Sequence, residues 1–223
     1  TLIMSDILPK KAQVVIIGGG VVGCSVAYHL AKLGFTDIVL LERKKLTSGT
    51  TWHAAGLVGQ MRSSLNLTQM VQYSGNLYET LEAETGMATG YRRTGSVSLA
   101  TNQERLAEFK RNASLAKVHD VDVQILTTEE LKDKINLFNL DDVVGGAWIP
   151  KDGKADPANV AMALAKGAKN NGVKIFEDVK VTGILKDDGK VKGVQTKIGD
   201  IQSEVVVNCG GMWAREVGKM AGV

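Results

Sequence analysis

The segment QVVIIGGGVVG, residues 13–23, decides the fold class of this 223-residue chain. Its first five residues form a mostly β-branched run, which is typical of a strand buried on both faces. Three glycines end the run, and residues 21–33 then read as a helix, with Gly34 as its stop signal. Residues 37–41, DIVLL, repeat the buried-strand pattern. The sequence therefore predicts a βαβ unit and an α/β fold.

The glycines at the junction between strand and helix follow the pattern G-x-G-x-x-G, at Gly18, Gly20 and Gly23. Gly18 permits a tight turn, Gly20 lets the backbone approach a pyrophosphate, and Gly23 lets the helix pack closely on the strand. Phosphates would lie at the helix N-terminus beside Val21 and Val22, because free N–H groups and the helix dipole favour anions there. The pattern therefore predicts a dinucleotide site.

Glu42 ends the second predicted strand, 24 residues after Gly18. This spacing is close to the ~20 residues expected for a carboxylate that binds a ribose diol. A carboxylate at this place disfavours a 2′-phosphate, so FAD and NAD are favoured over NADP. The glycines and Glu42 alone leave the choice between FAD and NAD open.

The remaining predicted elements alternate along the chain. We expect helices at 67–85, 102–118, 157–171 and 212–220, and strands at 96–100, 123–126, 143–149, 174–176, 179–185, 190–196 and 204–208. This order predicts a Rossmann-like dinucleotide-binding domain whose two halves are residues 10–90 and 152–223. Residues 91–151 are expected to form part of an inserted α+β substrate domain.

Composition and charge exclude several classes of protein. The 27 basic and 24 acidic residues are interspersed, which argues against a nucleic-acid partner. No apolar run reaches the ~18 residues of a membrane span. Cys24 and Cys209 are far apart and without a CxxC motif, and the three histidines lack metal-ligand spacing. We therefore expect no metal site, and we identify no catalytic acid or base.

The loop TSGTTWHAAGL, residues 47–57, resembles the loop after the second strand in FAD-dependent sarcosine and dimethylglycine dehydrogenases, which are related to D-amino-acid oxidase. Further segments that resemble these enzymes are Thr94–Ser96, Ile149–Gly153, Asp156–Pro157, Val181–Ile184 and Val207–Ala214. The resemblance covers nearly the whole chain. It implies an FAD-binding domain of the glutathione-reductase type, with FAD rather than NAD as the cofactor.

The resemblance also implies a covalent bond between His53 and the flavin 8α-methyl group. A neutral imidazole is a competent nucleophile near pH 7, because histidine in model peptides titrates near ~6.5. Gly49 and Gly56 flank the loop and would let its backbone fold tightly over a ring. The residues alone also allow a hydrogen-bonded loop histidine beside a noncovalent FAD.

Other positions take their roles from the same resemblance. Val181 is expected to contact the adenine end through its backbone, and Trp213 either lies near the FAD or is a core aromatic. For Trp52 and Tyr91 we expect core packing as the main role. The candidate cofactor-binding residues are Gly18, Gly20, Val21, Val22, Gly23, Glu42, Arg43, Gly49, Thr50, Thr51, Trp52, His53, Ala54, Ala55, Gly56, Leu57, Val181, Gly210 and Trp213.

The activity that the resemblance implies is oxidative N-demethylation of a small N-methylated amino acid, such as sarcosine or dimethylglycine, by hydride transfer to the flavin. Electrons would leave to an electron-transfer flavoprotein or to O₂, in the bacterial cytoplasm or the mitochondrial matrix. Tetrahydrofolate could accept the released carbon in a C-terminal domain. We expect that domain and most of the substrate site beyond Val223, so that this truncated chain alone is inactive.

Two other functions stay open. The regulatory subunit of pyruvate dehydrogenase phosphatase resembles the same family but lacks a histidine at the position of His53. An NAD-dependent dehydrogenase would explain Gly18–Gly23 and Glu42, but it leaves residues 47–57 without a purpose.

Overall fold

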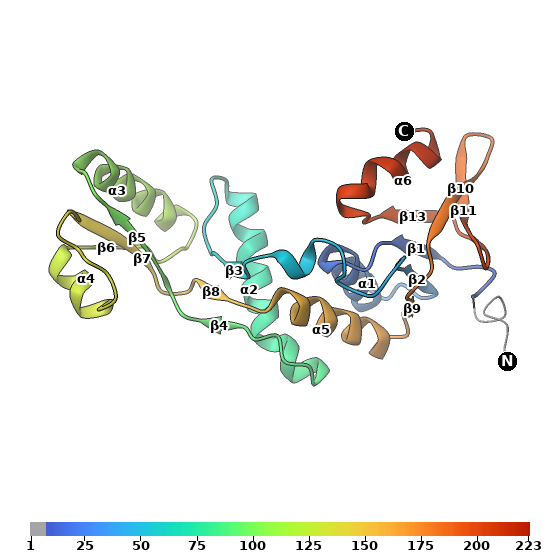
Figure 1. The fold of residues 1–223 in the computed structure, drawn as a ribbon, viewed down its shortest axis with the longest axis horizontal. Helices are drawn as coiled ribbons and strands as arrows, with labels where there is room; N and C mark the ends of the chain where they lie inside the picture. The colour runs from blue at the N-terminus through green and yellow to red at the C-terminus, as the bar shows by residue number, and fades with distance from the viewer. Residues whose placement is uncertain (1–7) are drawn as a thin grey trace. The chain divides into compact units, whose positions relative to one another are not determined.

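The structure is a computed structural model that describes residues 8–223, and these fall into two compact units (Figure 1). The first unit contains residues 8–55, together with Leu81–Thr89 and Asp156–Val223. The second unit contains Gly56–Thr80 and Gly90–Ala155. Each unit has its own sheets and its own hydrophobic clusters.

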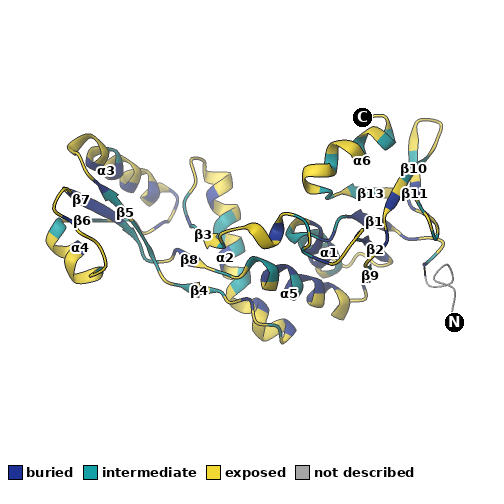
Figure 2. Ribbon diagram, in the orientation of Figure 1, coloured by how far each residue is buried: buried dark blue, intermediate teal, exposed yellow. Residues whose placement is uncertain are grey.

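A four-stranded parallel sheet forms the centre of the first unit. Its strands are β1 (Val14–Ile17), β2 (Ile38–Leu41), β9 (Lys174–Phe176) and β13 (Val205–Asn208), in the order β13-β1-β2-β9. Every residue of β1 and β2 is buried (Figure 2), as the unbroken apolar runs predict for strands covered on both faces.

Helices α1 (Val21–Lys32) and α5 (Pro157–Asn170) pack against each other and against this sheet. Tyr28 of α1 is almost fully buried, and a Cβ added at Gly167 of α5 would lie 2.8 Å from its ring. The missing side chain at Gly167 therefore lets the two helices approach closely. Asp156 caps α5 by accepting a hydrogen bond from the N–H of Asn159, as the sequence predicts.

A three-stranded antiparallel sheet belongs to the same core. Its strands are β10 (Val181–Asp187), β11 (Lys190–Thr196) and β12 (Gly199–Gln202). Side chains that alternate along the parallel strands point to one face, so these strands present Val15, Ile17, Val39 and Leu41 to Val194 and Ile201. Helix α6 (Ala214–Ala221) follows a 3₁₀ turn, η3 (Gly211–Trp213), and packs on β10.

The second unit contains the antiparallel sheet β5-β7-β6 (Ser96–Ala100, Gly145–Ile149 and Gln124–Leu126). Helices α3 (Gln103–Val118) and α4 (Thr128–Lys134) pack on it. Leu106 and Phe109 of α3 pack with Ala100 and Ala147, whereas Leu131 of α4 packs with Leu126, Leu140 and Val143. The two helices thus bury separate hydrophobic clusters.

A smaller sheet in this unit joins three two-residue strands in the order β3-β8-β4 (Leu57–Val58, Gly153–Lys154 and Arg92–Arg93). Asp152 precedes β8 and is buried, and its carboxylate accepts hydrogen bonds from the N–H of Gln60 and the hydroxyl of Ser96, each at 2.6 Å. Helix α2 (Leu65–Thr85) begins after β3. Asp152 therefore joins three separate stretches of this unit.

The α/β fold predicted from the sequence is confirmed, and the predicted helices and strands occur with ends shifted by a few residues. Helix α4 and the strands β3, β4, β8 and β12 were not predicted. The sequence predicts one domain half at 10–90, whereas residues 56–80 cluster with the second unit. How the chain divides into cofactor and substrate domains stays a prediction.

No helix among the described residues is long and apolar enough to cross a membrane.

Candidate dinucleotide site

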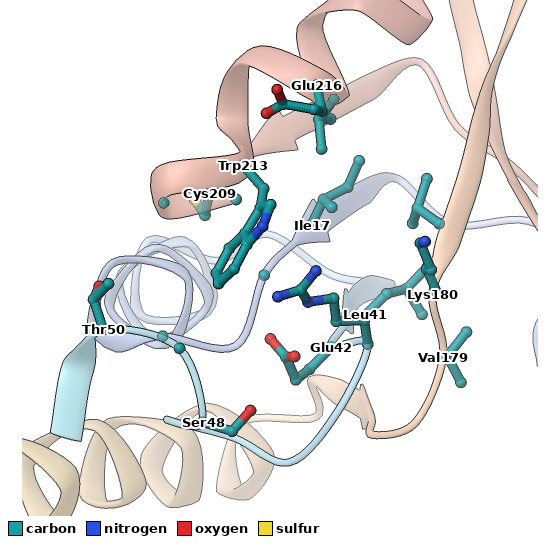
Figure 3. Close-up of a pocket in the computed structure, with 18 of the residues that line it drawn as sticks. Ile17, Leu41, Glu42, Ser48, Thr50, Val179, Lys180, Cys209, Trp213 and Glu216 are labelled. Carbon is teal, nitrogen blue, oxygen red and sulfur yellow. The ribbon is translucent and has the colours of Figure 1, made fainter. Parts of the chain in front are cut away.

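A cavity of about 390 Å³ lies in the first unit at the carboxyl ends of β1 and β2 (Figure 3). This is the place where open parallel sheets bind ligands. The sequence-predicted residues that line it are Gly18, Gly20, Glu42, Arg43, Gly49, Thr50, Thr51, Val181, Gly210 and Trp213. Segments far apart in the chain therefore meet around one cavity.

The glycine turn at the end of β1 leaves no room for side chains at two positions. Gly18 has a φ of +111°, which L side chains rarely adopt, and a Cβ there would collide with the carbonyl oxygen of Cys209. A Cβ at Gly23 would collide with the carbonyl oxygen of Gly18. At Gly20 the nearest atom to an added Cβ would be the Thr51 hydroxyl oxygen at 3.1 Å. The turn therefore presents bare backbone to the cavity.

Helix α1 begins directly after this turn. Its N-cap residue, Gly20, offers no side chain, and no acidic residue occurs in its first turn. Thr51 supplies the missing acceptor, because its hydroxyl oxygen accepts a hydrogen bond from the N–H of Val21 at 3.0 Å. The helix dipole favours an anion at this end. Val21, Val22 and Gly23 belong to this first turn, and none of the three lines the cavity.

Glu42 is held at the cavity wall by two backbone hydrogen bonds. Oε2 accepts from the N–H of Gly19 at 2.7 Å, and Oε1 accepts from the N–H of Lys44 at 2.8 Å. Each oxygen keeps a further lone pair, because an ionised carboxylate can accept about four hydrogen bonds. The carboxylate is therefore fixed in place and able to accept hydrogen bonds from ligand hydroxyl groups.

Trp213 extends its indole from η3 into the cavity, as Figure 3 shows. The guanidinium carbon of Arg43 lies 3.7 Å from the centre of its ring, which is a close cation–π contact. Trp213 is 37% exposed, so it is not a core aromatic. The pair joins the second residue after β2 to the segment after β13.

The loop that carries His53 also starts at this site. Residues Thr51–His53 form a 3₁₀ turn, η2, in which Thr51 is buried and His53 is exposed. Trp52 is 58% exposed, so the expectation that it packs in the core is wrong; its backbone lies on a surface turn. Trp52, His53, Ala54 and Ala55 do not line the cavity. Gly56 and Leu57 belong to the second unit, where Leu57 pairs with Lys154.

Several lining residues were not predicted. They are Ile17, Leu41, Ser48, Val179, Lys180, Cys209, Gly211, Glu216, Val217 and Met220. Most of them are next to a predicted residue, so their position near the ends of β1, β2 and β13 could have revealed them. Glu216, Val217 and Met220 come from one face of α6, and no motif in the sequence pointed to this helix as part of the site.

Burial raises the pKa of both thiols in this unit. The pKa of Cys24 rises to about 12, because the thiol is desolvated and the negative charge of Glu42 adds to that effect. Desolvation also raises the pKa of Cys209, which lines the cavity. Neither cysteine forms a disulfide within the described chain. Both are therefore neutral thiols near pH 7.

These features fit the adenosine diphosphate part of a dinucleotide. The cavity volume lies within the ~300–1,000 Å³ of ordinary ligand pockets. A bare glycine turn and a helix N-terminus suit phosphates, and the fixed carboxylate of Glu42 suits a ribose diol.

No group of histidine, cysteine or acidic residues suited to a metal ion occurs among residues 8–223.

Comparison with known proteins identifies the family. The chain is 46% identical to the mitochondrial sarcosine dehydrogenase of Homo sapiens, over 97% of the chain and 24% of that protein. It is 45% identical to the pyruvate dehydrogenase phosphatase regulatory subunit of Mus musculus, over 95% of the chain and 24% of that protein. It is 43% identical to the dimethylglycine dehydrogenase of Rattus norvegicus, over 96% of the chain and 25% of that protein. The chain thus spans about a quarter of the length of these relatives.

Among solved structures, L-proline dehydrogenase from P. horikoshii matches 97% of this chain and 57% of its own chain, with a TM-score of 0.91 at 33% identity. A family model described as "FAD dependent oxidoreductase" matches residues 13–223. The match includes the glycine turn, Glu42 and the segment of Trp213, which together form the cavity. The chain therefore belongs to the family of FAD-dependent oxidoreductases of the D-amino-acid oxidase type.

Proposed function

We propose that the protein oxidises the CH–NH group of a small N-methylated amino acid, with sarcosine and dimethylglycine as the leading candidates. The observation that carries the proposal is the cavity around Glu42 in a chain that aligns with sarcosine dehydrogenase over 97% of its length. The reaction is oxidative N-demethylation, in which the N-methyl carbon loses a hydride and the resulting iminium is hydrolysed to the amine and formaldehyde.

The residues around the cavity have separate tasks in this proposal. The backbone at Gly18 and Gly20, where α1 begins, would bind the phosphates, and the carboxylate of Glu42 would accept hydrogen bonds from the ribose hydroxyls. The backbone of Val181, which lines the cavity, would contact the adenine. FAD, when bound, supplies the acceptor for the hydride, and the protein positions it.

Further parts of the proposal concern the cofactor bond and the partners. We infer a covalent bond between His53 and the flavin, and an electron-transfer flavoprotein or O₂ as the electron acceptor. Tetrahydrofolate as the carbon acceptor is a further proposal, as is an inactive state of residues 1–223 alone. Mitochondrial and bacterial relatives support the mitochondrial matrix or the bacterial cytoplasm as the compartment.

The proposal is tested by adding amines to the oxidised full-length protein without oxygen. The absorbance of oxidised flavin at about 450 nm should fall when sarcosine or dimethylglycine is added. Lactate and other hydroxy acids serve as controls and should leave the absorbance unchanged. A protein that binds flavin and is bleached by no N-methylated amino acid would contradict the proposed substrate class.

The 45% identity to the phosphatase regulatory subunit supports a second candidate, a non-catalytic regulator. The presence of His53 favours the enzyme, because a regulator has no need for a flavin-attachment site. The two candidates differ in colour: an enzyme with a covalent flavin is yellow and stays yellow after acid precipitation. A colourless full-length protein that binds no added FAD would favour the regulator.

A further inference from the structure

Trp52 and His53 stack their rings on each other. The ring centroids are 3.8 Å apart, and the ring planes are tilted by 35°. Neighbouring residues do not make this contact by default, because a 3₁₀ helix has about 3.0 residues per turn and successive side chains point about 120° apart. The rings meet only if both side chains fold toward each other. Trp52 is 58% exposed, so its indole packs against the imidazole and not in the core.

The backbone beneath this pair is fixed. Thr51 is buried, and its hydroxyl accepts from the N–H of Val21 at 3.0 Å, which anchors the turn to the start of α1. The N–H of His53 donates to the carbonyl of Thr50 at 3.2 Å, and the N–H of Ala54 donates to the carbonyl of Thr51 at 3.2 Å. The freedom that is left to His53 is rotation of its side chain, and the stacked indole restricts that rotation.

The stack leaves the reactive part of the imidazole open. The lone pair of an imidazole nitrogen lies in the plane of the ring, so an indole packed on the face does not block it. The same indole excludes water from the face that it covers. A histidine held in this way offers its nitrogen edge in one direction, which favours reaction because the rotational freedom is already lost.

We propose that Trp52 is a positioning residue that holds the imidazole of His53 in the orientation from which a ring nitrogen bonds to the flavin. The inference rests on the covalent attachment proposed above. The new bond joins an imidazole nitrogen to the 8α carbon; the nitrogen loses its proton and the carbon loses one hydrogen. The two electrons and two protons pass to O₂, which leaves as hydrogen peroxide.

The test compares total and covalent flavin in the full-length protein. Apoprotein is mixed with FAD under air, and the flavin that stays with the protein after acid precipitation is followed over time. Trp52→Ala should bind FAD within about twofold of the wild type but attach it about three- to tenfold more slowly, which is the range that an aromatic pair supplies. Trp52→Phe keeps a stacking ring and should restore the rate to within about twofold.

Controls separate this inference from the function on which it rests. Phe138→Ala removes another exposed aromatic side chain, in the second unit, and should change neither quantity. His53→Ala should abolish covalent flavin; if it does not, the proposed attachment site is wrong. If attachment by Trp52→Ala is as fast as in the wild type, or if total binding falls as much as attachment, the positioning role of Trp52 is wrong.

A second measurement tests the stack without any flavin. The ring protons of His53, observed by NMR in apoprotein with ¹³C-labelled histidine and assigned with His53→Gln, should be shifted upfield by the indole. Trp52→Ala should move them to the position of an unstacked histidine. An unchanged spectrum would overturn the inference, and it would do so whether or not the flavin is covalent.

Discussion

The backbone N–H of Gly19 donates to Oε2 of Glu42 at 2.7 Å, so the glycine turn and the end of β2 are joined by a charge-assisted hydrogen bond. The other carboxylate oxygen is held by the N–H of Lys44. The group that is proposed to bind the ribose is thus oriented by the loop that is proposed to bind the phosphates. Ordering the carboxylate costs little on binding, because the fold has already fixed it.

Glu42→Gln should weaken FAD binding about ten- to a hundredfold, because a hydrogen bond to a charged group contributes about 1.5–3 kcal/mol. The amide has one acceptor oxygen for two backbone donors, and it lacks the charge. The dissociation constant is measured by flavin fluorescence in a His53→Ala background, so that binding stays reversible. Glu82→Gln, an exposed glutamate of α2, is the matched control. Equal affinities for the two variants would contradict the assigned role of Glu42.

Gly23→Ala should destabilise the protein by about 1–3 kcal/mol, because the added Cβ would collide with the carbonyl of Gly18 and the backbone must move. Gly218→Ala in α6 is the matched control: the nearest atom to its added Cβ would be 3.6 Å away, an ordinary contact. This control should stabilise the protein by about 0.5–1 kcal/mol. Urea denaturation measures both changes, and destabilisation of similar size at the two sites would show that the tight turn is not the cause.

The thiols of Cys24 and Cys209 should react slowly with a disulfide reagent at pH 8, because burial raises both pKa values and the thiolate is the nucleophile. Cys209 lines the cavity, so bound FAD should slow its reaction further, whereas Cys24 should react only after unfolding. Mass spectrometry of labelled peptides with and without FAD checks this, and Cys209→Ser should remove the FAD-sensitive signal. If bound FAD does not change the labelling of Cys209, the cofactor binds elsewhere.

The raised pKa of Cys24 also predicts how the free energy of unfolding depends on pH. In the unfolded chain Cys24 ionises from its ordinary pKa of 9.0, whereas in the folded protein it stays neutral until about 12. The folded state therefore loses stability as the pH rises through this window, because only the unfolded state releases the proton. Urea denaturation at pH 9 and pH 11 measures the loss, and Cys24→Ala should reduce it.

Asp152→Asn should destabilise the second unit by about 1–3 kcal/mol, because the asparagine keeps one acceptor oxygen and leaves a buried donor without a partner. The donors at stake are the N–H of Gln60 and the hydroxyl of Ser96. Asp133→Asn, at an exposed position of α4, should change stability by no more than about 0.5 kcal/mol. Hydrogen exchange at the amide of Gln60 should rise in Asp152→Asn alone.

The sequence predicted β1, α1 and β2 to within a residue or two, because the pattern that decides them is local: buried runs, a glycine turn and a stop signal. It missed α4, a seven-residue helix with one buried residue, Leu131. The capping box formed by Thr127 and Glu130 was the signal that could have revealed it. It predicted the strand at 204–208 but not its exposure: Val205 is 48% exposed, because burial depends on a strand's place in the sheet.

The candidate site shows the same limit. Gly18, Gly20 and Glu42 were found because the motif has a fixed spacing. The contact of Arg43 with Trp213 depends on β1 pairing with both β2 and β13, and no local pattern reports such a contact. The stack of Trp52 on His53 was also missed, although the two residues are adjacent, because the sequence does not reveal side-chain rotamers.

The first unit is assembled from stretches that the second unit interrupts, and Val14 pairs with Val205. During synthesis the glycine turn leaves the ribosome well before the segment from Cys209 to Trp213 that completes its cavity. Pairings so distant in sequence form slowly, because the chain between them must first be closed into a loop. A nascent chain that has not yet reached Trp213 therefore has no finished pocket, so cofactor loading begins only after that segment has been synthesised.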